Sequence, residues 1–146
     1  MGLKSYLEHC KESNDNLVAA KEVTFVVVLG NESCDLDSAV SAIAYAYFLN
    51  ETCNDPIIHI IPVLNAAEDD YCLKTEVGFW LQETLSLTAQ AITFKNQVPL
   101  ESLANENRLQ LVLVDHNQLA VNDAHFAHCV IEVVDHHKDS ETLDQR

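Results

Sequence analysis

Residues 26–49 of the chain, VVVLGNESCDLDSAVSAIAYAYFL, join an apolar run, a short polar turn and an alanine-rich apolar segment. Residues 23–29 are β-branched or apolar throughout, which is typical of a strand covered on both faces in a parallel sheet. Gly30 lets the chain turn, and the next helix is expected to begin at Asp37 or Ser38, because Asp and Ser are strong N-caps. The stretch therefore predicts a strand, a turn and a helix.

The helix pattern also predicts which of its faces is buried. Alanines at several positions would let the helix approach the sheet closely. The side chains expected to face the sheet are Val40, Ile43, Ala44, Tyr47 and Phe48.

The rest of the chain alternates strand patterns with helical ones. Further strands are expected at residues 57–64, 91–94, 109–114 and 130–134. Helices are expected at 3–21, 73–85 and 99–104, with a short helix or loop at 119–128. This alternation predicts one α/β layered domain over residues 1–146, with a mostly parallel five-stranded sheet flanked by helices.

Composition excludes several functional classes. The chain of 146 residues has 23 acidic and 8 basic residues and a formal charge of −15, so it should repel nucleic acid and anionic membranes. It would also repel a polyanionic substrate unless cations bridge the two. Five scattered cysteines, no signal-peptide pattern and no apolar run near the ~20 residues of a membrane span indicate a soluble, cytoplasmic protein.

Polar residues follow three of the predicted strands. The turn after residues 23–29 contains Asn31, Asp35 and Asp37. Residues 115–117, Asp-His-Asn, follow the strand at 109–114, and residues 135–137, Asp-His-His, follow the strand at 130–134. Because the carboxyl ends of parallel strands meet at one edge of a sheet, these groups are expected to lie together.

Such a group of side chains is suited to metal ions. An acidic residue directly after an uncharged strand is costly unless it is solvated, capped or coordinated. Carboxylates with imidazoles and no thiolate suit Mg²⁺ or Mn²⁺, with Co²⁺ possible. Two ions about 3.5–4 Å apart need a bridging carboxylate, for which Asp115 is the candidate, and such a pair serves phosphoanhydride or phosphodiester hydrolysis.

Each residue also has a simpler interpretation. Asp37 alone would be an N-cap and Asp35 a turn residue. Residues 115–117 could form a solvated turn, and His136 and His137 could be surface groups. Their joint position at three strand ends favours the metal site.

The motifs GNESCDLDS with its alanine-rich helix, IIPVLN, DHN and VVDHH carry a family resemblance. The chain resembles the DHH phosphoesterase superfamily, and within it the eukaryotic prune and exopolyphosphatase branch. That branch is related to the manganese-dependent family II inorganic pyrophosphatases. The resemblance runs from about residue 23 to residue 137.

The resemblance implies a role for each position. Asp35 and Asp37 would each hold one metal ion, Asp115 would bridge two, and His136 would be a further ligand. Asn31 stands where the pyrophosphatases have a ligating histidine, and the prune branch is similar to this chain in having asparagine there. The residues implied to take part in catalysis are Asp115, His136 and His137.

The remaining implied roles concern the substrate and the support of the ligands. His137 would contact the substrate phosphate, with Asn117 also on the substrate side. Asp135 would orient the neighbouring histidines. His116 would likewise support the metal ligands without binding an ion itself.

Relatives in this superfamily continue beyond the DHH motif. They have a fourth motif with another metal-binding aspartate, and a second domain whose basic residues grip the substrate. Asp139 and Asp144 lie too close to Asp135 to be given that role. The chain therefore resembles a truncated product of such a gene, without the C-terminal substrate-gripping domain.

Two functions are compatible with this pattern. The first is a metal-dependent phosphohydrolase that releases phosphate from short polyphosphate or a related phosphoanhydride through a water activated by two metal ions. The short chain alone is expected to be weakly active or inactive. The alternative is a non-catalytic regulatory or interaction module that keeps the fold and acts through protein partners.

Overall fold

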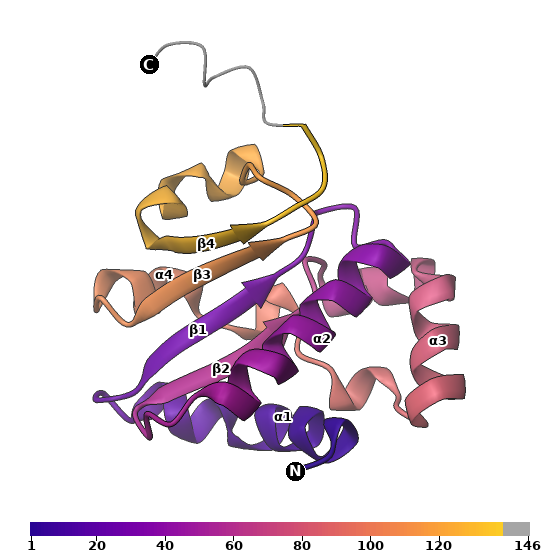
Figure 1. The fold of residues 1–146 in the computed structure, drawn as a ribbon, viewed down its shortest axis with the longest axis horizontal. Coiled ribbons are helices and arrows are strands. Elements are labelled where there is room, and N and C mark those ends of the chain that lie inside the picture. Colours follow the sequence, from indigo (N-terminus) through magenta and orange to yellow (C-terminus); the bar gives the residue numbers. More distant parts are fainter. Residues whose placement is uncertain (139–146) are drawn as a thin grey trace.

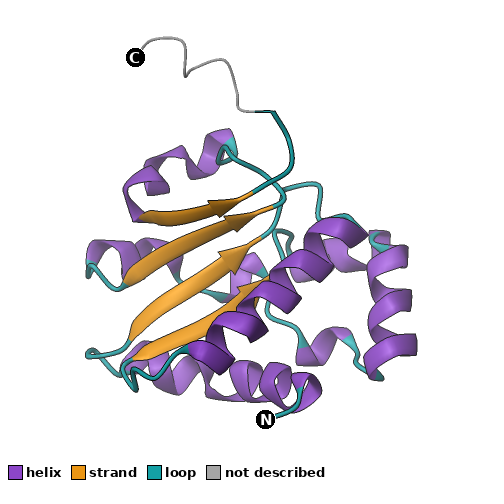
Figure 2. Cartoon of the chain, in the orientation of Figure 1, coloured by secondary structure: helices purple, strands orange, loops and turns teal. Residues whose placement is uncertain are grey.

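The sheet is parallel throughout, as the sequence predicts. The computed structural model describes residues 1–138, and these form one four-stranded sheet in the order β2-β1-β3-β4 (Figures 1 and 2). All three strand pairs are parallel. The α/β class is therefore confirmed. The strands are β1 (Thr24–Leu29), β2 (Ile58–Val63), β3 (Leu109–Val114) and β4 (Val130–Val134).

Helices connect the strands and cover the sheet. In Figure 1, α2 crosses one face of the sheet and α1 runs along the side of β2. No helix within residues 1–138 is long and apolar enough to cross a membrane. The α-helices are α1 (Leu3–Ala19), α2 (Leu36–Thr52), α3 (Thr75–Leu85) and α4 (Leu100–Asn105). The 3₁₀ helices are η1 (Glu68–Leu73), η2 (Ala89–Ala91), η3 (Lys95–Gln97) and η4 (Val121–Cys129).

The prediction of a strand at residues 91–94, and with it of a five-stranded sheet, is wrong. This segment makes only an isolated parallel bridge between Leu64 and Phe94, with the Leu64 N–H donating to the Thr93 carbonyl at 3.0 Å. The 3₁₀ helices η2 and η3 flank it directly, so too few residues remain extended to form a ladder. Its apolar residues are nevertheless buried, which explains why the sequence reads as a strand.

Strand β1 lies at the centre of the sheet and the core. It pairs with β2 on one side and β3 on the other, and all residues from Phe25 to Leu29 are buried. A central strand with helices on both faces has no solvated side, so every position favours an apolar residue. The continuous run in the sequence is the direct result.

The helix that follows starts earlier and faces differently than expected. Asp35, not Asp37, is the N-cap, and its Oδ1 accepts a hydrogen bond from the Ser38 N–H at 3.0 Å. Phe48 is 56% exposed and Ala44 is also exposed, so part of the predicted buried face is wrong. The residues of α2 that are buried are Ser38, Ala39, Ala42, Ile43 and Ala46.

The outer edge of β2 is covered. The Tyr6 hydroxyl donates to the Ile60 carbonyl at 2.8 Å, and the bridge at Leu64 covers the end of the strand. Pro62 shares the outward register of Ile60, because alternate residues of a strand direct their backbone groups to the same side. Its missing N–H therefore costs no bond to β1.

Arg108 ties the end of α1 to the sheet. Its side chain is almost fully buried, and it also forms an ion pair with Glu106 at 2.7 Å. A buried arginine must satisfy its donors, and the last carbonyls of a helix need partners. The guanidinium meets both needs, because it donates to the backbone carbonyls of Leu17, Val18, Ala20 and Val23.

We expect Arg108→Met to lower the free energy of unfolding by about 3 kcal/mol or more, because several buried carbonyls lose their donor. Urea denaturation measures the change. Lys21→Met is the matched control, since Lys21 pairs with the same Glu106 from an exposed position and should cost less than about 1 kcal/mol. Equal losses in the two variants would contradict this role of Arg108.

His59 in β2 is a half-buried histidine whose ring favours the neutral form. Its ring meets the Phe25 ring edge-on at 5.2 Å, and Nε2 is buried without a hydrogen-bond partner among the described residues. Burial, with a smaller contribution from the charge of His9, lowers the pKa of His59 to about 4. Protonation therefore favours the unfolded chain between pH ~6.5 and this lower value.

The lowered pKa of His59 predicts that the folded chain loses stability as the pH falls. As the pH falls through ~6.5, the unfolded chain protonates His59 while the folded chain does so only near pH 4. Relative to His59→Phe, the wild type should lose up to about 3 kcal/mol of stability over this interval and then level off. Denaturant unfolding of both proteins at a series of pH values tests it. A difference that stays constant with pH would refute the assignment.

Candidate metal centre

Three strand ends meet at one edge of the sheet. Because β1, β3 and β4 are parallel, their carboxyl ends lie side by side, as Figure 2 shows. The turn at residues 30–35 follows β1, Asp115 follows β3, and Asp135 follows β4. The sequence-based expectation that these segments share an edge is therefore confirmed.

Gly30 is needed for close packing of the first turn. A Cβ at this position would lie 2.2 Å from Ser38 Oγ, and the φ of Gly30 is not positive. The Asn31 N–H donates to Ser38 Oγ at 2.5 Å, and the Asn65 side chain donates to the Gly30 carbonyl at 2.9 Å. Glycine is therefore needed here because it lets the start of α2 pack closely against the end of β1. It is not needed for a positive φ.

Asp115 has a strained backbone. Its φ is 60°, in the left-handed region that Asp tolerates better than most residues. Its N–H donates to the Val134 carbonyl at 3.0 Å, and its side chain is 7% exposed. The turn directly after β3 is therefore held by β4, with the carboxylate buried at the strand ends.

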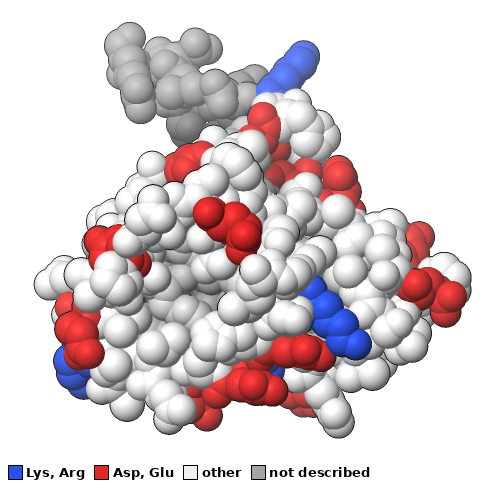
Figure 3. All heavy atoms as spheres, turned by 60° about the horizontal axis from the view of Figure 1, so that its bottom comes forward, with Lys and Arg blue, Asp and Glu red and all other residues white. Residues whose placement is uncertain are grey.

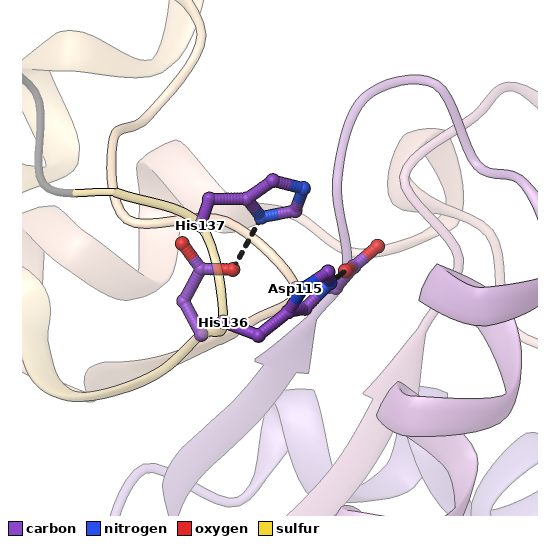
Figure 4. Close-up of side chains that lie close together, drawn as sticks. Asp115, His136 and His137 are labelled. Atoms are coloured by element: carbon purple, nitrogen blue, oxygen red, sulfur yellow. Dashed lines mark hydrogen bonds and ion pairs between the residues drawn. The ribbon is translucent and has the colours of Figure 1, made fainter.

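A cluster of carboxylates and imidazoles surrounds this position. One possible ligand atom from each of Asp115, Asp135, His136 and His137 lies within 4.8 Å of the others. His136 Nε2 donates to Asp115 Oδ1 at 2.9 Å and lies 3.8 Å from Asp37 Oδ2. Figure 4 shows His136 directed at Asp115 and His137 turned away from it.

Asp135 and His137 form a hydrogen-bonded pair. His137 Nδ1 donates to Asp135 Oδ1 at 2.5 Å, and the Asp135 side chain is only 4% exposed. Desolvation opposes ionisation of Asp135, but the bonds from His137 and the backbone prevail and lower the pKa of its carboxyl group. The same hydrogen bond chiefly raises the pKa of His137. The pair therefore favours a carboxylate beside an imidazolium.

The donors of the cluster fit a divalent cation. They are carboxylate oxygens and imidazole nitrogens with no thiolate, which suits Mg²⁺, Mn²⁺ or Co²⁺. Asp135 Oδ2 is buried and has no hydrogen-bond partner within residues 1–138. A buried carboxylate oxygen without a donor is costly, and the positive charge of a cation held by the neighbouring Asp115 and His136 would offset part of that cost.

The predicted ligands of the first turn differ in their availability. Asp37 lies beside His136, as given above, and is largely exposed. Asp35 uses Oδ1 to cap α2, which leaves Oδ2 for another partner. Asn31 Nδ2 donates to the Asp115 carbonyl at 3.4 Å, while its Oδ1 accepts from the Ser33 N–H at 3.1 Å. The structure thus brings Asp37 to the cluster, and it uses Asp35 and Asn31 to shape the turn.

The two remaining predicted residues lie beside the cluster. His116 Nδ1 is 2.9 Å from the Val114 carbonyl, and Asn117 donates to the Lys138 carbonyl at 3.0 Å. Both line a polar pocket of about 410 Å³ together with His137. A second pocket of about 490 Å³, on the side of α2, has a largely apolar lining. Its residues include Tyr45, Phe48, Val114, Val134, Asp37 and His136.

Two residues near the site were not identified from the sequence. Asn65 binds the Gly30 carbonyl and lines the polar pocket. Lys74, at the start of α3, donates to the Ser33 carbonyl at 2.5 Å and so holds the first turn. The signal for Asn65 is its place two residues after the end of β2, whereas nothing local predicts the contact of Lys74. Asp139 and Asp144 lie outside the described residues.

Comparison with known proteins places the chain in a family. Residues 25–146 match the model of the "DHH family, N-terminal domain". Exopolyphosphatase PRUNE1 of Rattus norvegicus is 37% identical over 134 residues, which cover 92% of this chain and 28% of the relative. The Bos taurus protein of the same name is 35% identical over 144 residues, 99% of this chain and 29% of the relative. Protein prune homolog 2 of Mus musculus is 31% identical over 132 residues, 90% of this chain and 4% of the relative.

Proposed function

This chain belongs to the DHH family, and we propose that it forms the metal-binding part of a phosphohydrolase that releases phosphate from short polyphosphate or a related phosphoanhydride. The cluster of Asp115, Asp135, His136 and His137 at the strand ends carries the proposal. The exopolyphosphatase names of the relatives support the reaction class. The chain spans only 28% of the length of the rat relative, so the activity of a whole protein is part of the proposal.

The residues that would hold the ions come from all three strand ends. His136 Nε2 lies near both Asp37 and Asp115, and Asp115 is the proposed bridging ligand. Asp35 would bind through Oδ2 and Asn31 through the second lone pair of Oδ1. Bound divalent ions supply charge neutralisation and lower the pKa of water, for which Mn²⁺ or Mg²⁺ are suitable.

His137 is the proposed contact to the substrate phosphate. Its Nδ1–H is bonded to Asp135, so Nε2 is the ring atom left for the polar pocket. Its raised pKa favours the protonated ring, which would donate to a phosphoryl oxygen through Nε2. Asn117 lines the same pocket and would contact the substrate beside it. Asp135 positions His137 and does not itself face the phosphate in this proposal.

The charge of the chain limits how it could hold a polyanion. Figure 3 shows acidic side chains spread widely over one face and few basic ones. Lys138 is the only Lys or Arg that lines either of the two pockets within the described residues. We propose that turnover depends on cationic groups beyond these 146 residues, and that ions at the cluster provide the attraction here.

Metal binding can be measured on the chain itself. We expect Mn²⁺ to bind at micromolar concentration in calorimetry, and Asp115→Asn to weaken binding by more than about 100-fold. Asp135→Asn, which removes a supporting group, should weaken it by about 10–100-fold. Asparagine tolerates the positive φ of residue 115 and still accepts a hydrogen bond, so the fold should persist.

The control is Asp69→Asn, which removes an exposed carboxylate of η1 and should leave binding unchanged. No Mn²⁺ binding by the wild type would contradict the metal centre and favour the non-catalytic interaction module. Unchanged binding by Asp115→Asn would contradict the bridging role alone.

Phosphate release from triphosphate with Mn²⁺ tests the second part of the proposal. The chain should turn over far more slowly than the rat exopolyphosphatase PRUNE1 assayed beside it, because its pockets offer little positive charge. In the rat protein, alanine at the position that corresponds to Asp115 should abolish the activity. Rapid turnover by the short chain would show that it needs no further cationic groups.

A further inference from the structure

A lysine from a distant part of the chain contacts the first turn of the metal centre. Lys74, the residue directly before α3, donates from Nζ to the Ser33 carbonyl at 2.5 Å. Within residues 1–138 this ammonium forms no ion pair with a carboxylate. Fixing a long lysine side chain costs conformational entropy. To be maintained, the contact must stabilise the turn by more than this cost.

The backbone of Lys74 is itself well fixed. Its N–H donates to the Tyr71 carbonyl at 2.9 Å, and its own carbonyl accepts from the Gly78 N–H at 3.0 Å. The helix α3 that follows is anchored by Val77 and Leu81, which are both buried. Figure 1 shows this helix beside α2. The lysine side chain therefore reaches the turn from a packed part of the fold.

The carbonyl that Lys74 holds lies at the strained position of the turn. It belongs to the peptide unit between Ser33 and Cys34, and the rotation of this unit sets the φ of Cys34. That φ is 47°, in the left-handed region that is costly for residues other than glycine. The Cys34 N–H donates to the Asn31 carbonyl at 2.9 Å, and its side chain is buried. Lys74 thus restrains the peptide unit that comes just before Asp35, a proposed metal ligand.

The charge of Lys74 and its contact would act on a metal ion in opposite directions. Lys74 and Asp35 line the same small pocket of about 260 Å³, so a positive charge lies near a proposed ligand. Like charges repel, and by charge alone Lys74 would weaken the binding of a divalent cation. A turn that is ordered before binding would instead strengthen it, because less conformational freedom is lost on binding. The sign of the change on substitution separates the two effects.

We propose that Lys74 is a positioning residue of the metal centre. Its bond to the Ser33 carbonyl holds the turn at residues 31–37 in the conformation that receives a divalent cation, and this effect outweighs the repulsion of its charge. The inference rests on the proposed function, because it requires a cation at the strand ends. Lys74 binds neither the ion nor the substrate in this proposal, and it acts only through the turn.

Calorimetry with Mn²⁺ measures the effect on affinity. We expect Lys74→Met to weaken binding about tenfold, as the loss of a group that supports metal ligands does. Lys74→Ala should act in the same direction, whereas Lys74→Arg keeps a donor and the charge and should bind nearly as tightly as the wild type. Lys4→Met removes an exposed lysine of α1 and should leave the affinity unchanged. Unchanged or tighter binding by the neutral variants at residue 74, with the fold verified by circular dichroism, would overturn the proposal.

Hydrogen exchange tests the same contact without metal. The Cys34 N–H bonds within the turn, so its exchange rate reports how often the turn opens. We expect this amide to exchange about fivefold faster in Lys74→Met, with the buried Val27 of β1 unchanged. Equal rates at Cys34 would overturn the proposal. No Mn²⁺ binding by the wild type would instead overturn the proposed function, and the exchange rates would still decide whether Lys74 holds the turn.

Discussion

The close approach of α2 to the end of β1 is the constraint on which the site depends. Ser38 Oγ occupies the space that any side chain at residue 30 would need, and it accepts the Asn31 N–H. Asp35 caps the same helix end. These contacts leave the turn one compact path, and this path places Asp37 beside His136. Glycine and serine in this turn are therefore structural requirements of the carboxylate positions that follow.

The sequence predicts most strands well because their burial is two-sided. All the residues of β1 from Phe25 on are covered by helices and neighbouring strands, so no polar residue interrupts the pattern. The segment at 91–94 shows the limit of this reasoning. It is apolar and buried like a strand, but the 3₁₀ helices on both sides leave only a single bridge. Burial alone does not separate a strand from a short extended connection.

Side-chain directions were harder to predict than elements. The alanines and apolar residues of α2 fit more than one helical face, and packing chose the face of Ala42 and Ala46 over that of Phe48. Asp35 and Asp37 are equally good caps by residue type, and only the approach of Ser38 decides between them. The carbonyl contacts of Arg108 join residues about 90 positions apart in the chain, so no local pattern reveals them. The grouping at the strand ends was predictable, because parallel topology alone brings these residues together.

The metal centre depends on the placement of strand β4. The Val134 carbonyl holds the Asp115 N–H, and the next residues of the chain are Asp135, His136 and His137. The position of the cluster therefore depends on how firmly β4 is fixed, and β4 is paired on one side only within the described residues. The positive φ of Asp115 is maintained by this pairing together with the Asn31 amide, which donates to the Asp115 carbonyl.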